Sequence, residues 1–320
     1  AINVAMGIPN PKTKPSSKPK LALIAGPTAS GKTALALHLA KSHNIVIINA
    51  DSAQVYSDLP VLSAQPTAAE QARSPHKLFG YLDGVTACSA ARWAADAKVE
   101  IAAAHSAERL PVLVGGTGLY LRTLLNGIAP IPEIDAKLRA QIRALPVAES
   151  YKRLQAADAI MADRLGPTDS SRIARALEVI ESTGRSIAEW REEKGGGISD
   201  AVDLRPLVLL PPRDWLYERC DRRFDMMMNG GAVDEVKALL ARSLPADAPI
   251  VRAIGVPEIS NMLSGDMTRE DAIIRGKIVT RQYAKRQFTW FRNQSPIDWP
   301  RWEKEINDSN TKEIETLFQL

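Results

Sequence analysis

Residues 26–33 read GPTASGKT and fit the pattern GxxxxGK[ST]. The motif consists of Gly26, Pro27, Thr28, Ala29, Ser30, Gly31, Lys32 and Thr33. It follows an apolar run at residues 20–26 (KLALIAG) and precedes a segment in which leucines recur at helical spacing. A glycine-containing loop between a buried strand and a helix directs its backbone N–H groups at a phosphate, the lysine adds positive charge, and the threonine hydroxyl can bind Mg²⁺. The motif therefore predicts a di- or triphosphate site and leaves open which ligand fills it.

Further apolar runs predict three more buried strands, at residues 45–50 (IVIINA), 110–115 (LPVLVG) and 206–210 (PLVLL). Helical spacing at residues 117–125 predicts a helix after the second of these runs. Strands that alternate with helices imply right-handed crossovers and a parallel sheet. The predicted fold class is therefore α/β, with a P-loop NTPase-like parallel sheet flanked by helices.

The segment 130–199 breaks this alternation, because it is helical and charge-rich, has no buried-strand run and closes with GGG at residues 195–197. We predict a helical insertion domain there. Residues 21–129 and 200–320 would form the α/β core with its C-terminal helices. Residues 1–20 hold Pro, Ser and Lys without an apolar run, so we expect a disordered basic tail and not a secretory signal.

The composition is that of a soluble globular protein: 45% of the 320 residues are hydrophobic and 24% are charged. No apolar run approaches the roughly 20 residues that cross a bilayer, so we expect no membrane partner. Cys88 and Cys220 lie far apart without CxxC spacing, which favours a reducing cytoplasm and argues against a structural zinc site. The net charge of +4 is a mild indication of a polyanionic partner.

The position of the acids near the phosphate loop bears on the chemistry. In nucleotide hydrolases a buried strand ends in an Asp that helps to hold Mg²⁺. Here the run at 110–115 continues into Gly116 and Thr117 with no acid, and the carboxylate at a strand end is Asp51. Ligands of open parallel sheets lie beyond the carboxyl ends of the strands. An Asp after a strand most often caps the next helix, but opposite a phosphate loop Asp51 is a candidate base or Mg²⁺ ligand.

The segment 269–292 is rich in positive and aromatic residues. The positive residues are Arg269, Arg275, Lys277, Arg281, Lys285, Arg286 and Arg292. One interpretation is a solvated helix that packs its aromatic residues inward. The positive charges are not offset by acids at i,i+4, which favours contacts to phosphates of a small substrate or of a nucleic-acid backbone.

Six stretches of the chain together resemble the tRNA dimethylallyltransferase (tRNA isopentenyltransferase) family. They are GPTASGKTALA at 26–36, NADSAQVY at 49–56, PVLVGGTGLYLR at 111–122, RIARALEVIESTG at 172–184, RAIGVPEI at 252–259 and TRQYAKRQFTWFR at 280–292. They occur in the family's order and extend over nearly the whole chain. No zinc finger of the eukaryotic type is present, so we expect the bacterial type.

The resemblance implies that the dimethylallyl group of dimethylallyl diphosphate is transferred to N6 of the adenosine 3′ of the anticodon in tRNA. The phosphate loop would then hold a diphosphate leaving group. The resemblance assigns the proton of N6 to Asp51 and a place in the reaction channel to Thr117. Lys32, Thr33 with Mg²⁺, and either Arg281 or Arg286 would neutralise the departing diphosphate. Asp51 and Thr33 are the candidate Mg²⁺ ligands, and the adenine must be flipped out of its stack.

The resemblance also implies residues that contact tRNA in its anticodon stem-loop. They are Asp51, Ser52, Ala53, Gln54, Ser171, Arg172, Ile173, Ala174, Arg175, Arg252 and Gly255. Some positions depart from the family pattern. Residues 62–66 read LSAQP where Gly-Thr-Ala-Lys-Pro is common, Val256 and Pro257 replace Tyr-Arg, and Ser171 replaces a frequent glutamine. These departures weaken individual tRNA contacts without changing the phosphate loop or Asp51.

Two other functions fit parts of the sequence. The first alternative is a P-loop kinase for a small molecule, with ATP in the loop, although neither an arginine-rich lid nor a second Mg²⁺-binding acid is evident. The second is an RNA-binding protein with a relic loop, against which the intact Lys32 and Thr33 argue. We expect a monomer.

Overall fold

The computed structural model describes residues 18–320, so most of the predicted basic tail lies outside the described residues. The centre of the fold is a six-stranded sheet with the order β3-β2-β4-β1-β5-β6, and its strand pairs are parallel. The strands are β1 (Lys20–Ala25), β2 (Ile45–Asn49), β3 (His76–Lys77), β4 (Leu110–Gly115), β5 (Asp203–Leu209) and β6 (Arg301–Trp302). The predicted parallel α/β sheet is confirmed. The sequence did not indicate the short edge strands β3 and β6.

Helices cover both faces of the sheet, because residues of each strand alternate between two cores. In β1, Leu21 and Leu23 belong to one hydrophobic cluster, whereas Ala22 and Ile24 belong to the other. The second cluster also contains residues of α1 (Lys32–Leu39) and α14 (Thr311–Thr316). The first cluster contains residues of the remaining core helices that surround the site. They are α3 (Ala90–Ser106), α4 (Gly118–Asn126), α10 (Arg213–Asn229), α11 (Ala232–Ala241), α12 (Val256–Ser264) and α13 (Arg269–Gln294).

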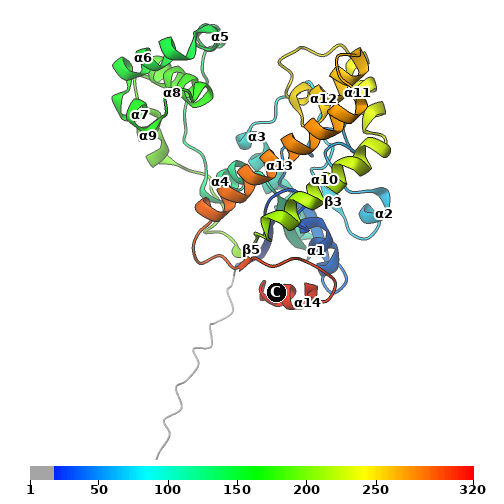
Figure 1. Ribbon diagram of the computed structural model, residues 1–320. Helices are drawn as coiled ribbons and strands as arrows, with labels where there is room; N and C mark the ends of the chain where they lie inside the picture. Colours follow the sequence, from blue (N-terminus) through cyan, green and yellow to red (C-terminus); the bar gives the residue numbers. More distant parts are fainter. Residues whose placement is uncertain (1–17) are drawn as a thin grey trace, which may run out of the picture.

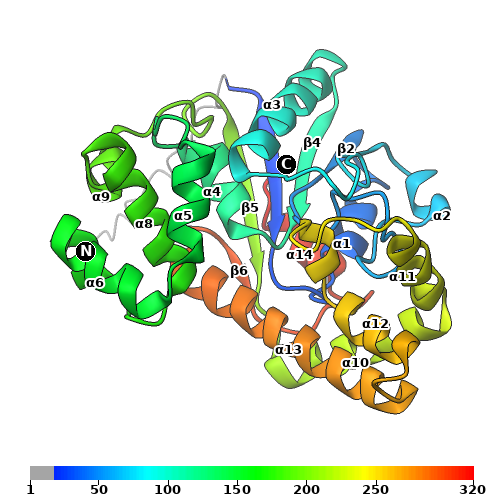
Figure 2. The same ribbon diagram turned by 90° about the horizontal axis from the view of Figure 1, so that it is seen from above.

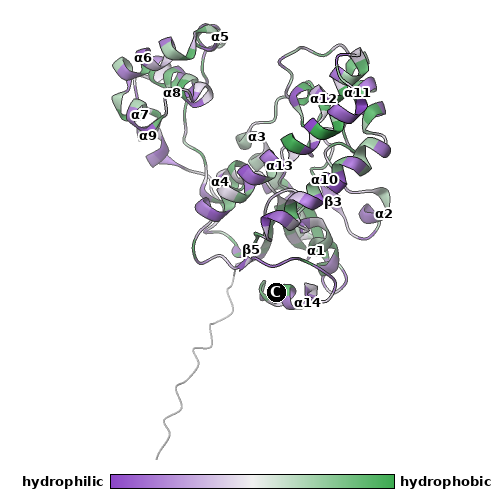
Figure 3. Ribbon diagram, in the orientation of Figure 1, coloured by the Kyte–Doolittle hydropathy of each residue, from purple (hydrophilic) through white to green (hydrophobic). Residues whose placement is uncertain are grey.

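Five helices of the predicted insertion form a lobe of their own beside the sheet (Figures 1 and 2). They are α5 (Ala136–Ala144), α6 (Val147–Ala157), α7 (Ala159–Arg164), α8 (Ser170–Thr183) and α9 (Ile187–Trp190). Figure 3 shows these helices banded in hydrophilic and hydrophobic colours, as amphipathic helices around a core would be. A separate hydrophobic cluster joins Leu154, Ile173 and Leu177 in that core, so the lobe is packed independently of the sheet.

Helix α13 is 26 residues long and extends from the α10–α12 side of the molecule toward the base of the lobe (Figure 1). It packs along α10 and α12 and touches α4 at its other end. Among residues 18–320, no helix is both long and apolar enough to cross a membrane. The position of α13 brings its side chains to the carboxyl ends of β2 and β4.

Candidate active site

The phosphate loop connects β1 to α1, as the motif predicts. Gly31 precedes α1 with φ of 99°, a left-handed conformation that glycine adopts without a steric penalty. The Nζ of Lys32 donates to the carbonyl oxygens of Gly26 (3.0 Å) and Pro27 (2.7 Å). Burial lowers the pKa of Lys32 to about 8, and the charge of Asp51 opposes this shift. The Oγ of Ser30 is fully buried and has no hydrogen-bond partner among the described residues, so the loop retains an unused polar group for a phosphate oxygen.

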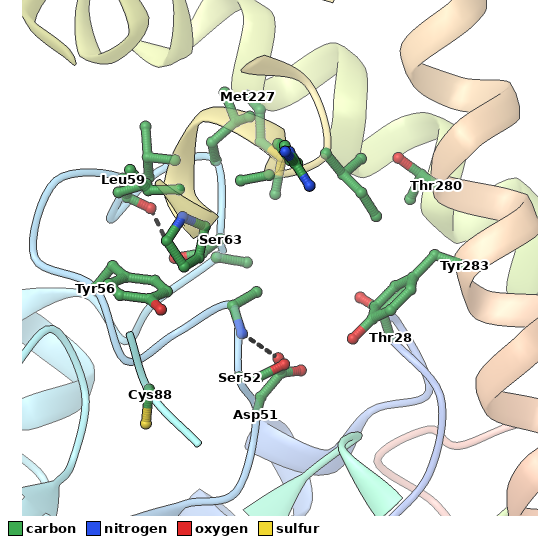
Figure 4. A pocket seen from close by; sticks show the side chains of 18 of the residues that line it. Thr28, Asp51, Ser52, Tyr56, Leu59, Ser63, Cys88, Met227, Thr280 and Tyr283 are labelled. Carbon is green, nitrogen blue, oxygen red and sulfur yellow. Dashed lines mark hydrogen bonds between the residues drawn. The ribbon is translucent and has the colours of Figure 1, made fainter. Parts of the chain in front are cut away.

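Asp51 lies directly after β2 and faces the same crevice as the phosphate loop (Figure 4). Its backbone is fixed by Asn49, whose Oδ1 accepts the Asp51 N–H (2.8 Å) and whose Nδ2 donates to the Asp51 carbonyl (2.9 Å). One carboxylate oxygen, Oδ1, accepts the N–H of Ala53 (2.9 Å), which stabilises the turn at residues 52–55. The expectation that an Asp here caps the next helix is wrong, because that helix begins only at Ala68. Asp51 is only 9% exposed, and its Oδ2 is left to act on a ligand.

Thr117, in the turn after β4, is tied to the Asp51 segment. Its Oγ1 accepts the N–H of Ser52 (2.9 Å) and donates to the Ser52 Oγ (3.1 Å). From α13, Tyr283 points toward Ser52 (Figure 4), and its hydroxyl lies within hydrogen-bonding reach of Ser52 and Thr117. Burial raises the pKa of Tyr283 and the nearby Asp51 charge adds to the shift, so its hydroxyl stays protonated. The predicted channel residue Thr117 thus stands beside Asp51.

Two contiguous cavities meet at Asp51. The larger, the apolar cavity, has a volume of about 600 Å³, and the smaller, the loop cavity, has about 220 Å³ and is bounded by the phosphate loop. The residues that line both are Thr28, Asp51, Ser63, Ala64 and Arg223. Hydrophobic side chains such as Leu59 and Met227 form much of the wall of the apolar cavity (Figure 4). The arrangement accommodates a molecule with a phosphorylated end and an apolar end.

Two arginines of α10 reach the phosphate loop, and the sequence analysis missed both. Arg223 donates to the Thr28 Oγ1 (3.3 Å), and Arg219 donates to the Ala29 carbonyl (2.9 Å). Burial lowers the pKa of Arg223, which lines both cavities. The i,i+4 spacing of Arg219 and Arg223 on a helix that also carries buried Cys220 and Phe224 was the available signal.

The position of Arg281 does not favour its predicted contact with the diphosphate. Its Nη1 is 2.6 Å from the Asp221 Oδ2, and Arg281 does not line either cavity. Lys277 is likewise paired, at 2.7 Å from Asp225. The observation that acids at i,i+4 do not offset these charges stands, but it did not reveal that Arg281 and Lys277 have acidic partners on another helix. Their acids come from α10, which packs along α13, and spacing within one helix cannot reveal such partners.

Arg286 does lie at the site, and it lines both the apolar cavity and a second depression. This depression, the basic groove, has a volume of about 740 Å³ and lies between α4, α8 and α13. Its lining residues are Arg122, Arg172, Gln282, Lys285, Arg286, Thr289, Trp290, Asn293 and Gln294. The Arg122 guanidinium stacks over the Trp290 ring at 5.1 Å. The groove joins positive charge to an aromatic surface, which suits a nucleic acid.

The remaining predicted tRNA residues are spread over several surfaces. Arg172 lines the basic groove, and Arg252 lines the apolar cavity together with Ser52 and Ala53. Gln54 faces the loop cavity and donates to the Ser63 and Ala64 carbonyls.

Within the lobe, the other predicted contacts differ in exposure. Ser171 and Ala174 line a small cavity of the lobe, and Arg175 pairs with the buried Glu178 (3.4 Å). Ile173 is fully buried in the core of the lobe, so its side chain cannot contact RNA. Gly255 directly precedes α12 and lies close to Leu62. Its φ of 92° allows the backbone to turn into the helix there.

The departures from the family pattern are accommodated by the loop at residues 59–65. The Ser63 Oγ donates to the Leu59 carbonyl (2.6 Å), and the Gln65 Nε2 donates to the Tyr56 carbonyl (2.7 Å). The Glu235 carboxylate accepts the N–H groups of Val61 and Leu62. Ser63 and Gln65 therefore hold the loop in place at the cavity wall and supply no positive charge.

The donors near the loop fit Mg²⁺. Thr33 and Asp51 both line the loop cavity, and they offer a hydroxyl and a carboxylate. Among the described residues, no group of three His, Cys, Asp or Glu side chains is placed to hold a metal. Mg²⁺ needs few protein ligands, because it usually keeps several waters and binds substrate phosphates. Glu70 also lines this cavity, but its carboxylate is engaged in the cap of helix α2 (Ala68–Gln71).

Cys88 and Cys220 are both free. Cys88 lies at the wall of the apolar cavity (Figure 4). Burial raises the pKa of Cys220 to about 11, so this thiol is unreactive.

A parallel sheet with a phosphate loop after its first strand places this chain in the P-loop class. A family model described as IPP transferase matches residues 54–294, and a model described as zeta toxin matches residues 8–68, which include the phosphate loop. The chain belongs to the IPP transferase family. It is 60% identical over 282 residues to the tRNA dimethylallyltransferase of Sphingopyxis alaskensis, with 88% of this chain and 92% of that protein covered.

Solved structures agree with this assignment. The chain is similar to the tRNA isopentenylpyrophosphate transferase of Bacillus halodurans, with 34% identity, a TM-score of 0.69, and coverage of 94% of this chain and 96% of that one. It is also similar to a eukaryotic dimethylallyltransferase acting on tRNA, with 27% identity and a TM-score of 0.80, over 93% of this chain and 77% of that one. The predicted family is confirmed.

Proposed function

We propose that this protein is a tRNA dimethylallyltransferase, which moves the dimethylallyl group of dimethylallyl diphosphate to N6 of the adenosine 3′ of the anticodon. The observation that carries the proposal is the junction at Asp51, where the loop cavity and the apolar cavity meet. The loop cavity would hold the diphosphate, and the apolar cavity would hold the prenyl group and the flipped adenine. The similarity to tRNA dimethylallyltransferases over most of the chain supports it.

In the proposed reaction, the amine at N6 attacks the allylic carbon, a C–N bond forms, and the C–O bond to the diphosphate breaks. Asp51 Oδ2 accepts the proton that N6 loses, since Oδ1 is already engaged with Ala53. Thr117 and Ser52 form the hydroxyl edge of the channel beside Asp51. The buried position excludes water that would otherwise hydrolyse the allylic diphosphate.

Negative charge on the departing diphosphate would be neutralised by Lys32, Arg223 and the backbone N–H groups of the loop. Arg286 stands at the opposite wall, where it can contact either the diphosphate or the RNA. Bound Mg²⁺ would be held mainly by Thr33 and by the diphosphate itself, with Asp51 nearby but occupied as the base, and it would supply further charge neutralisation at the diphosphate.

Transfer of label is the direct test of the function. Incubation with dimethylallyl diphosphate labelled in its prenyl group, Mg²⁺ and unmodified tRNA should place label in the RNA. Calorimetry should show tighter binding of dimethylallyl diphosphate than of ATP, because the apolar cavity complements a prenyl group and no acid follows β4. Tight ATP binding without measurable binding of the prenyl diphosphate would favour the kinase alternative.

Binding of tRNA should depend on salt through the basic groove. We expect Arg122→Ala and Arg172→Ala each to make the slope of log K against log salt shallower by about 0.7 to 0.9 and to raise KM for tRNA, because each removes one phosphate contact. Lys237→Ala on α11 is the matched control, since it removes an exposed charge outside the groove. Equal slopes for wild type and the three variants would show that the groove does not bind the RNA backbone.

A further inference from the structure

Gln287 of α13 is a buried amide that bridges two loops of the site. Its side chain is 5% exposed. The Oε1 accepts the N–H of Thr28 in the phosphate loop (2.8 Å), and the Nε2 donates to the carbonyl of Gly116 after β4 (3.0 Å). Because one partner is a donor and the other an acceptor, the amide must adopt this single orientation to satisfy both. No role was assigned to Gln287 from the sequence.

The bridge requires close approach of the backbone at Gly116. A Cβ there would lie 2.2 Å from the Gln287 Nε2 and 3.1 Å from the Gly26 carbonyl oxygen. Only glycine therefore allows the side chain to reach between the phosphate loop and the turn after β4. Loss of either hydrogen bond would leave a buried backbone group without a partner, which costs about 1–3 kcal/mol.

The bridge also fixes the position of α13 relative to the phosphate loop and the turn after β4. Tyr283, one helical turn before Gln287, lies within hydrogen-bonding reach of Thr117 and Ser52, and Arg286 directly precedes Gln287. At the other end of the bridge, the hydroxyl of Thr28 accepts a hydrogen bond from Arg223. One amide thus joins the phosphate loop, the Thr117 turn and the helix that carries the opposite wall of the cavity.

We infer that Gln287 is a positioning residue for the transfer reaction: it fixes the phosphate loop relative to Thr117, Tyr283 and Arg286. It does not contact the reacting atoms, and it acts through the groups that do. This inference rests on the proposed function for its kinetic consequence, whereas its structural consequence at Thr28 is independent of that function. A misplacement of about 1 Å at a reacting centre costs on the order of 10²-fold in rate.

Two variants of Gln287 separate positioning from packing. Gln287→Met keeps the volume and removes both hydrogen bonds, so kcat should fall about 10- to 100-fold while KM for tRNA stays unchanged. In Gln287→Glu, a protonated carboxyl has the shape of the amide and restores both bonds, whereas a carboxylate repels the Gly116 carbonyl. Burial raises the pKa of a carboxyl group. The kcat of Gln287→Glu relative to wild type should therefore rise as pH falls from about 8 to 6.

Dividing the kcat of Gln287→Glu by the wild-type kcat at each pH removes the effect of groups that titrate in both proteins. The titratable and charged groups on the elements that meet here are Lys32 of α1, Asp51 after β2, Arg223 of α10, and Tyr283 and Arg286 of α13. Gln155→Met, at an exposed position of α6, is the control for the substitution itself and should leave kcat and its pH profile as in wild type.

Hydrogen exchange provides a readout that does not require transfer activity. Peptides from residues 26–33 should exchange faster in Gln287→Met than in wild type, because the Thr28 N–H loses its acceptor. Unchanged exchange and an unchanged kcat in Gln287→Met would overturn the inference. So would a ratio of Gln287→Glu kcat to wild-type kcat that does not change with pH. If wild type transferred no label, the proposed function would fail, and the exchange measurement would still decide whether Gln287 holds the loop.

Discussion

Asp51→Ala should lower kcat for prenyl transfer by roughly 10²–10⁴-fold, the range expected when a general base is removed. The affinity for dimethylallyl diphosphate should be nearly unchanged, because the loop N–H groups and Lys32 provide most of the phosphate contacts. Single-turnover transfer to tRNA and calorimetry with the diphosphate measure the two quantities separately.

Asp51→Asn provides the sharper comparison. The amide oxygen still accepts the Ala53 N–H, so the local backbone is retained, but the side chain no longer takes a proton. Both variants should therefore lose transfer, and their thermal midpoints should remain close to that of wild type. Near wild-type turnover in Asp51→Asn would exclude Asp51 as the base and leave it only its role in the turn at residues 52–55.

Arg223→Gln should lower kcat/KM by about 10²–10³-fold, the usual effect of removing one preorganised group that stabilises developing charge. Arg223 is half-buried and reaches Thr28 of the phosphate loop, where charge would develop on the leaving diphosphate in the proposed reaction. Arg281→Gln should change kcat/KM by less than about fivefold, since a partly exposed ion pair is worth about 0–1 kcal/mol. Steady-state kinetics with varied dimethylallyl diphosphate compare the two.

The two variants make a matched pair, because each replaces an arginine on α10 or α13 by the same residue. A larger loss in Arg281→Gln than in Arg223→Gln would reverse the assignment of these arginines. It would mean that Arg281 leaves Asp221 and moves to the diphosphate when substrate binds. A circular dichroism spectrum of each variant checks that the helices are retained.

The sequence predicted those parts of the site that depend on neighbours along the chain. The phosphate loop follows from a local pattern of glycines, Lys32 and Thr33 between a strand and a helix, and Asp51 follows from the end of the next strand. Strands β3 and β6 were missed, because two residues cannot display the periodicity of a strand. Their strand geometry comes from pairing with β2 and β5.

Contacts between helices were the part that the sequence could not supply. Arg281 and Lys277 of α13 looked unpaired because their acids, Asp221 and Asp225, lie 60 and 52 residues earlier in the chain, on α10. Arg223 was overlooked for a related reason: its i,i+4 spacing with Arg219 marks one face of α10 but does not say which loop that face contacts. Ile173 falls in a motif of the family, but its helical spacing places it in the core of the lobe.

The way in which the lobe is attached has a consequence for how this enzyme can diverge. The chain leaves and re-enters the sheet domain at one point, where Ile128 and Gly195 exchange two backbone hydrogen bonds (3.1 and 3.2 Å). A pair of this kind has Cα atoms only about 5.5 Å apart. Helices between these residues can therefore lengthen, shorten or change sequence without moving the ends of β4 and β5. The RNA contacts proposed for the lobe can therefore diverge without displacing the proposed base, Asp51.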